Sequence, residues 1–246
     1  MGSSAPSTSY SITISNRSTV SQSYAIFSQV PTITPTAQGL TSHAILVAKG
    51  VAPKSGTAYF SIPRESYYAI CGTSHQDEAT TIHVLDRRPV TLGVAEASIL
   101  RPGTTCVTKV FSDTLSFALW GGPAVDRGEA GAFCIQTDSD FTYKEATTNH
   151  FILGFGLSTS GSAHVGLYAS FIPTPRTTYQ ITPSRVFYVV PRQLSVNAPR
   201  SDEEFANACQ VDFSTRSAHV KLAHNDSNVI DVLDDDSSFS SSISKL

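Results

Sequence analysis

Charged residues are scarce in this sequence. Asp, Glu, Lys and Arg make up 15% of its 246 residues, against about a quarter in an average soluble domain. The formal net charge is -3, and the basic residues stand singly along the chain. A protein that binds nucleic acid normally carries a basic patch or stripe. The sequence therefore argues against nucleic acid as a partner.

Long apolar runs are also missing. No stretch approaches the roughly 18 residues that a membrane-spanning helix needs, so we expect no membrane segment. The first residues, MGSSAP, lack the charged and apolar regions of a secretory signal. Two glycosylation acceptors, Asn16 and Asn225, are typical of a secreted chain, whereas Ser244-Lys245-Leu246 has the form of a peroxisomal address. Localisation stays open between the secretory pathway and the peroxisome.

Motifs for the common enzymatic chemistries are absent as well. The sequence has no Gly-x-Ser-x-Gly elbow, His-Glu-x-x-His pair, phosphate loop or dinucleotide fingerprint. None of the seven histidines alternate on one strand, as a cupin-like metal site requires. We therefore expect neither a metal nor a cofactor. A hydrolase assembled from loop carboxylates stays open, with candidates Asp77, Glu78, Asp86, Asp113, Asp126, Glu129 and Glu145.

Cysteine is limited to four widely spaced residues: Cys71, Cys106, Cys134 and Cys209. This spacing excludes the Cys-x-x-Cys pairs of zinc ribbons and thioredoxin-like proteins. In an oxidising compartment the four form at most two disulfides, with three possible connectivities. In a reducing compartment they are buried thiols, which suits the apolar, strand-like surroundings of Cys71 and Cys134. Both interpretations stay open.

What the sequence does contain is a rhythm of short alternating segments, such as YSITI at 10–14 and AHVGLY at 163–168. Clusters of Gly, Pro, Ser and Asn separate them, a pattern typical of strands and turns. The sequence therefore predicts an all-β fold, either an antiparallel β-sandwich or a barrel-like structure. The expected strands are 10–15, 24–30, 43–49, 58–62, 67–71, 81–85, 105–111, 115–119, 132–137, 151–157, 163–171, 178–181 and 186–190, with a last hairpin or edge at 219–222 and 229–232.

One short C-terminal helix is expected. Ser201 and Glu204 have the spacing of a capping box, which predicts a helix that runs to about Cys209. The chain is long for one domain, yet β-sandwiches of this size often fold as a unit. We expect a flexible N-terminus over 1–9, a single all-β domain over 10–232 and a disordered acidic, Ser-rich tail over 233–246.

Four segments carry a resemblance to a known family: YSITISN at 10–16, YAIF at 24–27, YAICG at 68–72 and TYQITP at 178–183. Together they resemble a family of small fungal proteins that includes the hetero-Diels–Alderases of tropolone sesquiterpenoid biosynthesis. The resemblance spans residues 10–191. It implies a cofactor-independent pericyclase that joins a quinone-methide-type tropolone to a terpene, both of them apolar small molecules.

Such a reaction needs reactants held in a near-attack geometry and no nucleophile, which agrees with the missing motifs. We expect amphipathic aromatics beside bends to wall the substrate site, with Trp120, Tyr68, Phe155 and Tyr188 as candidates. Because Tyr67 and Tyr68 are adjacent on one strand, only one of the two can face a given side. The expected donors to a substrate carbonyl are Arg64, His150 and Arg192. The alternative is a secreted, noncatalytic, lectin-like protein that binds carbohydrate or small molecules.

Overall fold

The structure is a computed structural model that describes residues 9–64, 66–75, 81–96, 99–118, 125–158, 165–201, 205 and 207–233. Strands make up most of its described part, which also contains one short α-helix. This confirms the all-β class. None of the described sheets closes into a barrel, so the sandwich is the architecture that forms. No helix of the described part is long and apolar enough to cross a membrane.

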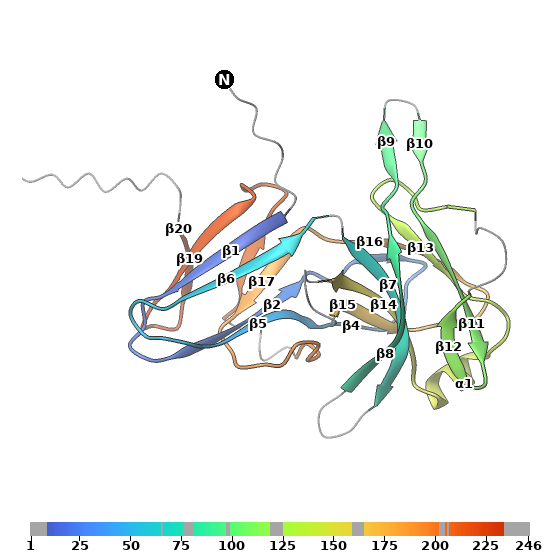
Figure 1. Ribbon diagram of the computed structural model, residues 1–246, viewed down its shortest axis with the longest axis horizontal. Coiled ribbons are helices and arrows are strands. Elements are labelled where there is room, and N and C mark those ends of the chain that lie inside the picture. The colour runs from blue at the N-terminus through green and yellow to red at the C-terminus, as the bar shows by residue number, and fades with distance from the viewer. Residues whose placement is uncertain are drawn as a thin grey trace, which may run out of the picture.

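The first of two sandwiches contains β1 (Ser9–Asn16), β2 (Gln22–Ser28), β5 (Ala44–Val51), β6 (Thr57–Pro63), β17 (Val186–Val190), β18 (Cys209–Asp212), β19 (His219–His224) and β20 (Ile230–Leu233). One four-stranded sheet has the order β20-β19-β1-β6, and the other has the order β18-β17-β2-β5. Strands from both ends of the chain thus build this sandwich (Figure 1).

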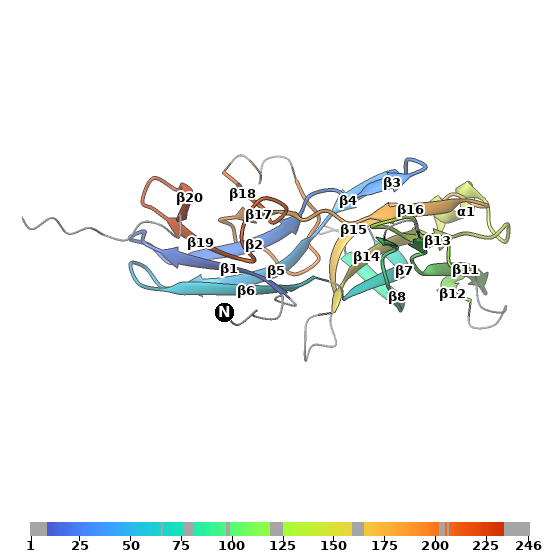
Figure 2. The same cartoon turned by 90° about the horizontal axis from the view of Figure 1, so that it is seen from above.

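The second sandwich contains β3 (Thr32–Thr34), β4 (Gln38–Ser42), β7 (Tyr67–His75), β8 (Thr81–Val90), β11 (Thr105–Phe111), β12 (Thr114–Phe117), β13 (Phe133–Gln136), β14 (Phe151–Ser158), β15 (Val165–Ile172) and β16 (Thr178–Thr182). Its five-stranded sheets have the orders β12-β11-β13-β16-β3 and β4-β15-β14-β7-β8. Figures 1 and 2 show the two sandwiches side by side along the long axis of the molecule.

Antiparallel pairing dominates, as expected, but two strand pairs are parallel: β1 with β19, and β11 with β13. A small hairpin, β9 (Val94–Glu96) with β10 (Ile99–Arg101), projects from the second sandwich in Figure 1. Its described residues are exposed, and Arg101 pairs with Glu96 across it at 3.4 Å.

The chain crosses between the sandwiches after β2, between β4 and β5, after β6 and after β16. At the second crossing, His43 links the two strands and forms a bridge with Pro199. One continuous hydrophobic core runs through both sandwiches, from Ile12 and Ile26 in the first to Phe133 and Leu153 in the second. The two sandwiches are therefore held together by shared packing as well as by the chain.

The prediction that a helix after Ser201 runs to about Cys209 is wrong. Phe205 lies in a 3₁₀ turn and Cys209 already opens β18, where it pairs with Val189 of β17. Tertiary strand pairing therefore overrides the local helix signal. The α-helix is α1 (Tyr143–Thr148), capped by a reciprocal box in which the Thr142 N–H donates to Glu145 Oε2 at 2.6 Å.

Most expected strands are present within a few residues of their expected ends, whereas β3, β4, β9, β10 and β18 were not expected. Strand β1 begins at Ser9 and β20 ends at Leu233. Residues 1–8 and 234–246, which make up nearly all of the expected terminal segments, lie outside the described residues.

Candidate functional site

The three expected donors belong to different parts of the fold. Arg64 follows β6 at a crossing between the sandwiches. His150 lies between α1 and β14, with φ at 54°, and its carbonyl accepts from Ser74 N–H. From Tyr67 to Ser74 along β7 is about 20 Å at the usual strand rise, so His150 is far from the crossing that holds Arg64. Arg192 is exposed in the segment after β17.

The three expected wall residues that the structure describes also lie in different places. Phe155 of β14 is fully buried. Tyr68 packs with Ile70 and Leu167 on the outer face of its sheet, and Arg87 lies 5.8 Å from its ring centroid. Trp120 lies outside the described residues.

The fourth wall residue, Tyr188, packs against Phe205 with ring centroids 5.3 Å apart, within a small cluster separate from the main core. Of the adjacent tyrosines, it is Tyr67 that faces the main core.

Aromatic rings and one guanidinium gather where the two sandwiches meet. We call this set the junction cluster: Tyr10, Arg64, Tyr67, Phe155, Tyr168, Phe187 and Phe213. β1, β17 and the residue after β18 supply its first-sandwich members, whereas β7, β14 and β15 supply the rest apart from Arg64. It thus unites one expected donor, Arg64, with one expected wall residue, Phe155.

Tyr10 contacts both Phe213 and Arg64 in the first-sandwich half of the cluster. Its ring stacks on Phe213, with centroids 4.3 Å apart and an interplanar angle of 16°. The Cζ of Arg64 lies 4.5 Å from the same centroid. Since Phe213 covers one face, the guanidinium takes the other, in a cation–π contact that favours a partly desolvated charge.

Tyr168 is the centre of the second-sandwich half. Phe155 stacks on it with centroids 5.1 Å apart, and Phe187 and Tyr67 lie 6.2 and 6.1 Å away. A register shift in β14 at Phe155 and Gly156 accompanies this packing. Burial, followed by the nearby phenols of Tyr67 and Tyr10, raises the pKa of Tyr168 well above its ordinary value. Its hydroxyl therefore stays protonated and able to donate a hydrogen bond.

Arg64 is electrostatically unusual. Its Nε is buried and has no hydrogen-bond partner among the described residues. The ion pairs of the described part join Arg88 to Asp86, Arg101 to Glu96 and Lys109 to Asp138, and none involves Arg64. A buried donor normally has a partner, because leaving it unpaired costs about 1–3 kcal/mol. The junction cluster therefore contains a buried N–H group that no described residue uses.

A serine–histidine pair, which sequence reasoning missed, lies at another crossing. His43 Nδ1 is 3.2 Å from the Asn197 carbonyl, and Nε2 is 2.8 Å from Ser170 Oγ. Because a carbonyl only accepts, Nδ1 carries the proton and Nε2 accepts from the serine. Burial lowers the pKa of His43 to about 4, and both side chains are under 5% exposed. No sequence signal links residues 127 apart, and this burial favours a structural role.

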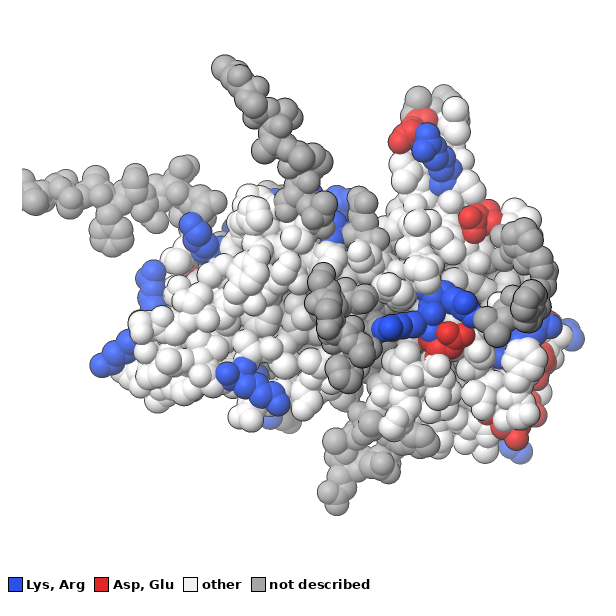
Figure 3. Space-filling model, in the orientation of Figure 1, with Lys and Arg blue, Asp and Glu red and all other residues white. Residues whose placement is uncertain are grey.

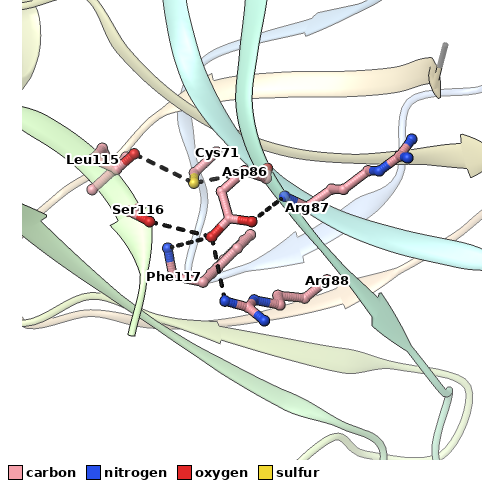
Figure 4. Close-up of polar contacts among 7 residues, drawn as sticks. All are labelled: Cys71, Asp86, Arg87, Arg88, Leu115, Ser116 and Phe117. Carbon is pink, nitrogen blue, oxygen red and sulfur yellow. Dashed lines mark hydrogen bonds and ion pairs between the residues drawn. The ribbon is translucent and has the colours of Figure 1, made fainter. Parts of the chain in front are cut away.

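A second polar cluster surrounds Asp86, one of the carboxylates considered for a loop-built hydrolase (Figure 4). It lies within β8, and its Oδ2 accepts from Ser116 Oγ and Phe117 N–H, both at 3.2 Å. The Cys71 thiol beside it donates to the Leu115 carbonyl at 3.5 Å. Burial raises the pKa of Cys71 to about 12. These groups are engaged in joining β12 to β7 and β8.

All four cysteines are free thiols, and Cys71, Cys106 and Cys134 are buried. Of the two open interpretations, the structure has the thiol form. Burial raises the pKa of Cys106 to about 12 as well, which suppresses thiolate chemistry there. Among the described residues, no group of three or more His, Cys, Asp or Glu side chains is placed to hold a metal ion.

The interpretation of Asn16 as a glycan acceptor is wrong for the folded protein. The side chain is fully buried, and its Nδ2 donates to the carbonyls of Val20, Val51 and Ala52 at 3.0 Å each. Its Oδ1 accepts from the hydroxyl of Ser18 at 2.7 Å. At this position the Asn16 side chain joins the end of β1 to the end of β5 by hydrogen bonds.

Charge on the face drawn in Figure 3 is sparse, and its Lys and Arg side chains are scattered without a continuous basic stripe. No protein-family model, curated protein or solved structure matches this chain.

Proposed function

We propose that this protein is a cofactor-free pericyclase whose reacting site is the junction cluster. It binds a quinone-methide-type tropolone and a terpene there and joins them by a hetero-Diels–Alder cycloaddition. The observation that supports this most is the Arg64 guanidinium, with its unpartnered Nε set among aromatic rings.

The aromatic rings provide the binding energy for apolar reactants. Phe155, Tyr168, Phe187 and Phe213 are all at most 5% exposed, so a molecule seated beside them loses contact with water. Flat rings pack against other flat rings with favourable dispersion and offset stacking. Holding two reactants in the right relative orientation removes much of the entropic barrier to their reaction.

The donors of the cluster act on the oxygen of the heterodiene. Arg64 N–H, and the hydroxyl of Tyr168 that burial keeps protonated, are suited to hydrogen-bond the carbonyl. Such bonds withdraw electron density and strengthen as charge develops on oxygen in the transition state. In the cycloaddition, the terminal carbon and the oxygen of the heterodiene each form one σ bond to an alkene carbon of the terpene. Three π bonds become two σ bonds and one π bond, and no group leaves.

The test is the rate and stereochemistry of coupling when the quinone methide is generated in solution with a macrocyclic terpene. We expect faster turnover and a single stereoisomer with the protein, and a kcat about 100-fold lower for Arg64→Gln. Arg64→Lys should restore part of the loss.

The matched control is Arg200→Gln, which removes a guanidinium 3.8 Å from the Phe205 centroid, outside the junction cluster. Equal turnover with and without protein, or equal losses in the two glutamine variants, would reject the proposal.

One observation favours the carbohydrate-binding alternative: Tyr59, on the edge strand β6, is 65% exposed. An exposed ring on a sheet edge is suited to stacking on a sugar face. Binding of simple sugars that is lost in Tyr59→Ala and kept in Arg64→Gln would support this alternative over the pericyclase.

A further inference from the structure

We infer that the junction cluster takes its oxygenated ligand as an anion, with the ligand supplying the counter-charge that none of the described residues gives to Arg64. This inference rests on the proposed function for the location of the site. It adds the charge state of the ligand, and therefore its chemical class: a flat, apolar ring system that carries one ionised oxygen acid.

The first support is the isolation of the Arg64 charge. Its guanidinium contacts the face of Tyr10, and its Nε is buried without a partner among the described residues. A guanidinium does not lose its proton in a protein, so burial cannot neutralise it. Partly buried arginines are normally paired with a carboxylate, and the ion pairs of the described part all lie elsewhere.

The second support is the apolar character of the surroundings. Tyr10 and Phe213 are 7% and 5% exposed, and Phe187 is 2% exposed. In such a medium an ion pair is far stronger than in water, because the effective dielectric constant is lower. An anion seated here gains more from Arg64 than a neutral carbonyl of the same shape. The same environment keeps the phenol of Tyr168 neutral, so this tyrosine does not provide the missing negative charge.

The third support is the sparse charge of the chain. With a net charge of -3, the protein offers no general attraction to anions. Selectivity for an anion over its neutral analogue therefore has to come from a specific cation.

The test compares two fluorescent probes with nearly the same ring system, 8-anilinonaphthalene-1-sulfonate and the uncharged N-phenyl-1-naphthylamine. We expect saturable binding of the sulfonate to the wild-type protein, weakened about 10- to 100-fold in Arg64→Gln. Arg64→Lys should bind with intermediate affinity, and the uncharged probe should respond little to either change. Arg200→Gln is the control and should bind both probes as the wild type does.

A second arm needs no variant and so does not depend on Arg64→Gln folding. In the wild-type protein, 2-naphthoate should displace the sulfonate probe at about tenfold lower concentration than 2-naphthamide, its neutral isostere. Equal displacement by the two, absence of saturable sulfonate binding, or sulfonate binding untouched by Arg64→Gln would each overturn the inference. Neither probe undergoes cycloaddition. A failed coupling assay with anion selectivity intact would therefore reject the pericyclase alone.

Discussion

The hydroxyl of Ser170 donates to Nε2 of His43 across 2.8 Å, and this bond joins β15 to the crossing between β4 and β5. The other imidazole nitrogen donates to the carbonyl of Asn197, which holds the segment after β17 against the same crossing. The bond from Ser170 needs a neutral imidazole with its proton on Nδ1, because a protonated Nε2 can no longer accept a hydrogen bond. Protonation of His43 should therefore weaken this hydrogen-bonded link between the two sandwiches.

The first prediction concerns acid stability. Burial lowers the pKa of folded His43 from 6.5 to about 4, so the unfolded state binds more protons between these values. The free energy of unfolding therefore reaches its full value above pH 6.5. It falls as pH drops from 6.5 towards 4, by on the order of 3 kcal/mol from His43 alone. Urea unfolding across this range measures it.

In His43→Gln the free energy of unfolding should depend less steeply on pH. Some dependence should remain, because burial also lowers the pKa of His224. An identical slope in wild type and variant would contradict this account.

The second prediction concerns Asp86. Replacing it with alanine leaves the Phe117 N–H and the Ser116 hydroxyl without their acceptor, and we expect the free energy of unfolding to fall by about 2 kcal/mol. Arg88→Ala removes only an ion pair at 3.6 Å with a side chain 36% exposed. In this control variant the free energy of unfolding should fall by about 0.5 kcal/mol or less. Comparable losses in the two variants would show that the ion pair, and not the carboxylate's hydrogen bonds, joins β12 to β8.

The third prediction concerns Asn16. Asn16→Ala removes the donor shared by three backbone carbonyls and should destabilise the protein by about 2–4 kcal/mol. Asn225→Ala, in a more exposed turn where Oδ1 accepts from Ser227 N–H, should cost about 1 kcal/mol. Chemical denaturation gives both values. Expression through a secretory pathway adds an independent check, because a glycan attached to Asn16 of the folded protein is incompatible with this burial.

The fourth prediction concerns the thiols. Cys209 is half-buried, whereas Cys71, Cys106 and Cys134 are buried, and burial raises the pKa of Cys71 and Cys106 to about 12. A thiol reagent near pH 8 should therefore modify Cys209 first and the others only as the protein unfolds. Mass spectrometry of the time course identifies each site, and Cys209→Ser should remove the early phase. Early modification of Cys71 would contradict the packing described for β7.

Much of the fold was predictable because strand formation leaves a local signature. Side chains on a strand alternate between its faces, so runs such as YSITI at 10–14 indicated strands and buried positions together, and Ile12 and Ile14 are fully buried. The short strands β3, β9 and β10 were not predicted, since three residues are too few for a visible alternation. The helix after Ser201 was predicted from a real capping pattern, but pairing of Cys209 with Val189 decided the outcome.

The junction cluster was predictable only in part. Chemical type alone identified Arg64 and Phe155 as candidates, because a guanidinium donates hydrogen bonds and an aromatic ring binds apolar ligands. Tyr10, Tyr168 and Phe213 were missed, since nothing in their neighbouring residues separates them from ordinary core aromatics. His150 and Arg192 can donate hydrogen bonds as Arg64 does, yet they lie on other parts of the fold.

The sequence by itself determined the strands, the all-β class and the chemical types available, because backbone preference and side-chain alternation depend on near neighbours along the chain. Only the tertiary structure decided that the chain divides into two sandwiches and that the seven residues of the junction cluster meet between them. These residues extend from Tyr10 to Phe213, and sheet order and strand register bring them together. Order and register depend on how distant strands bury their faces against one another, which no local pattern specifies.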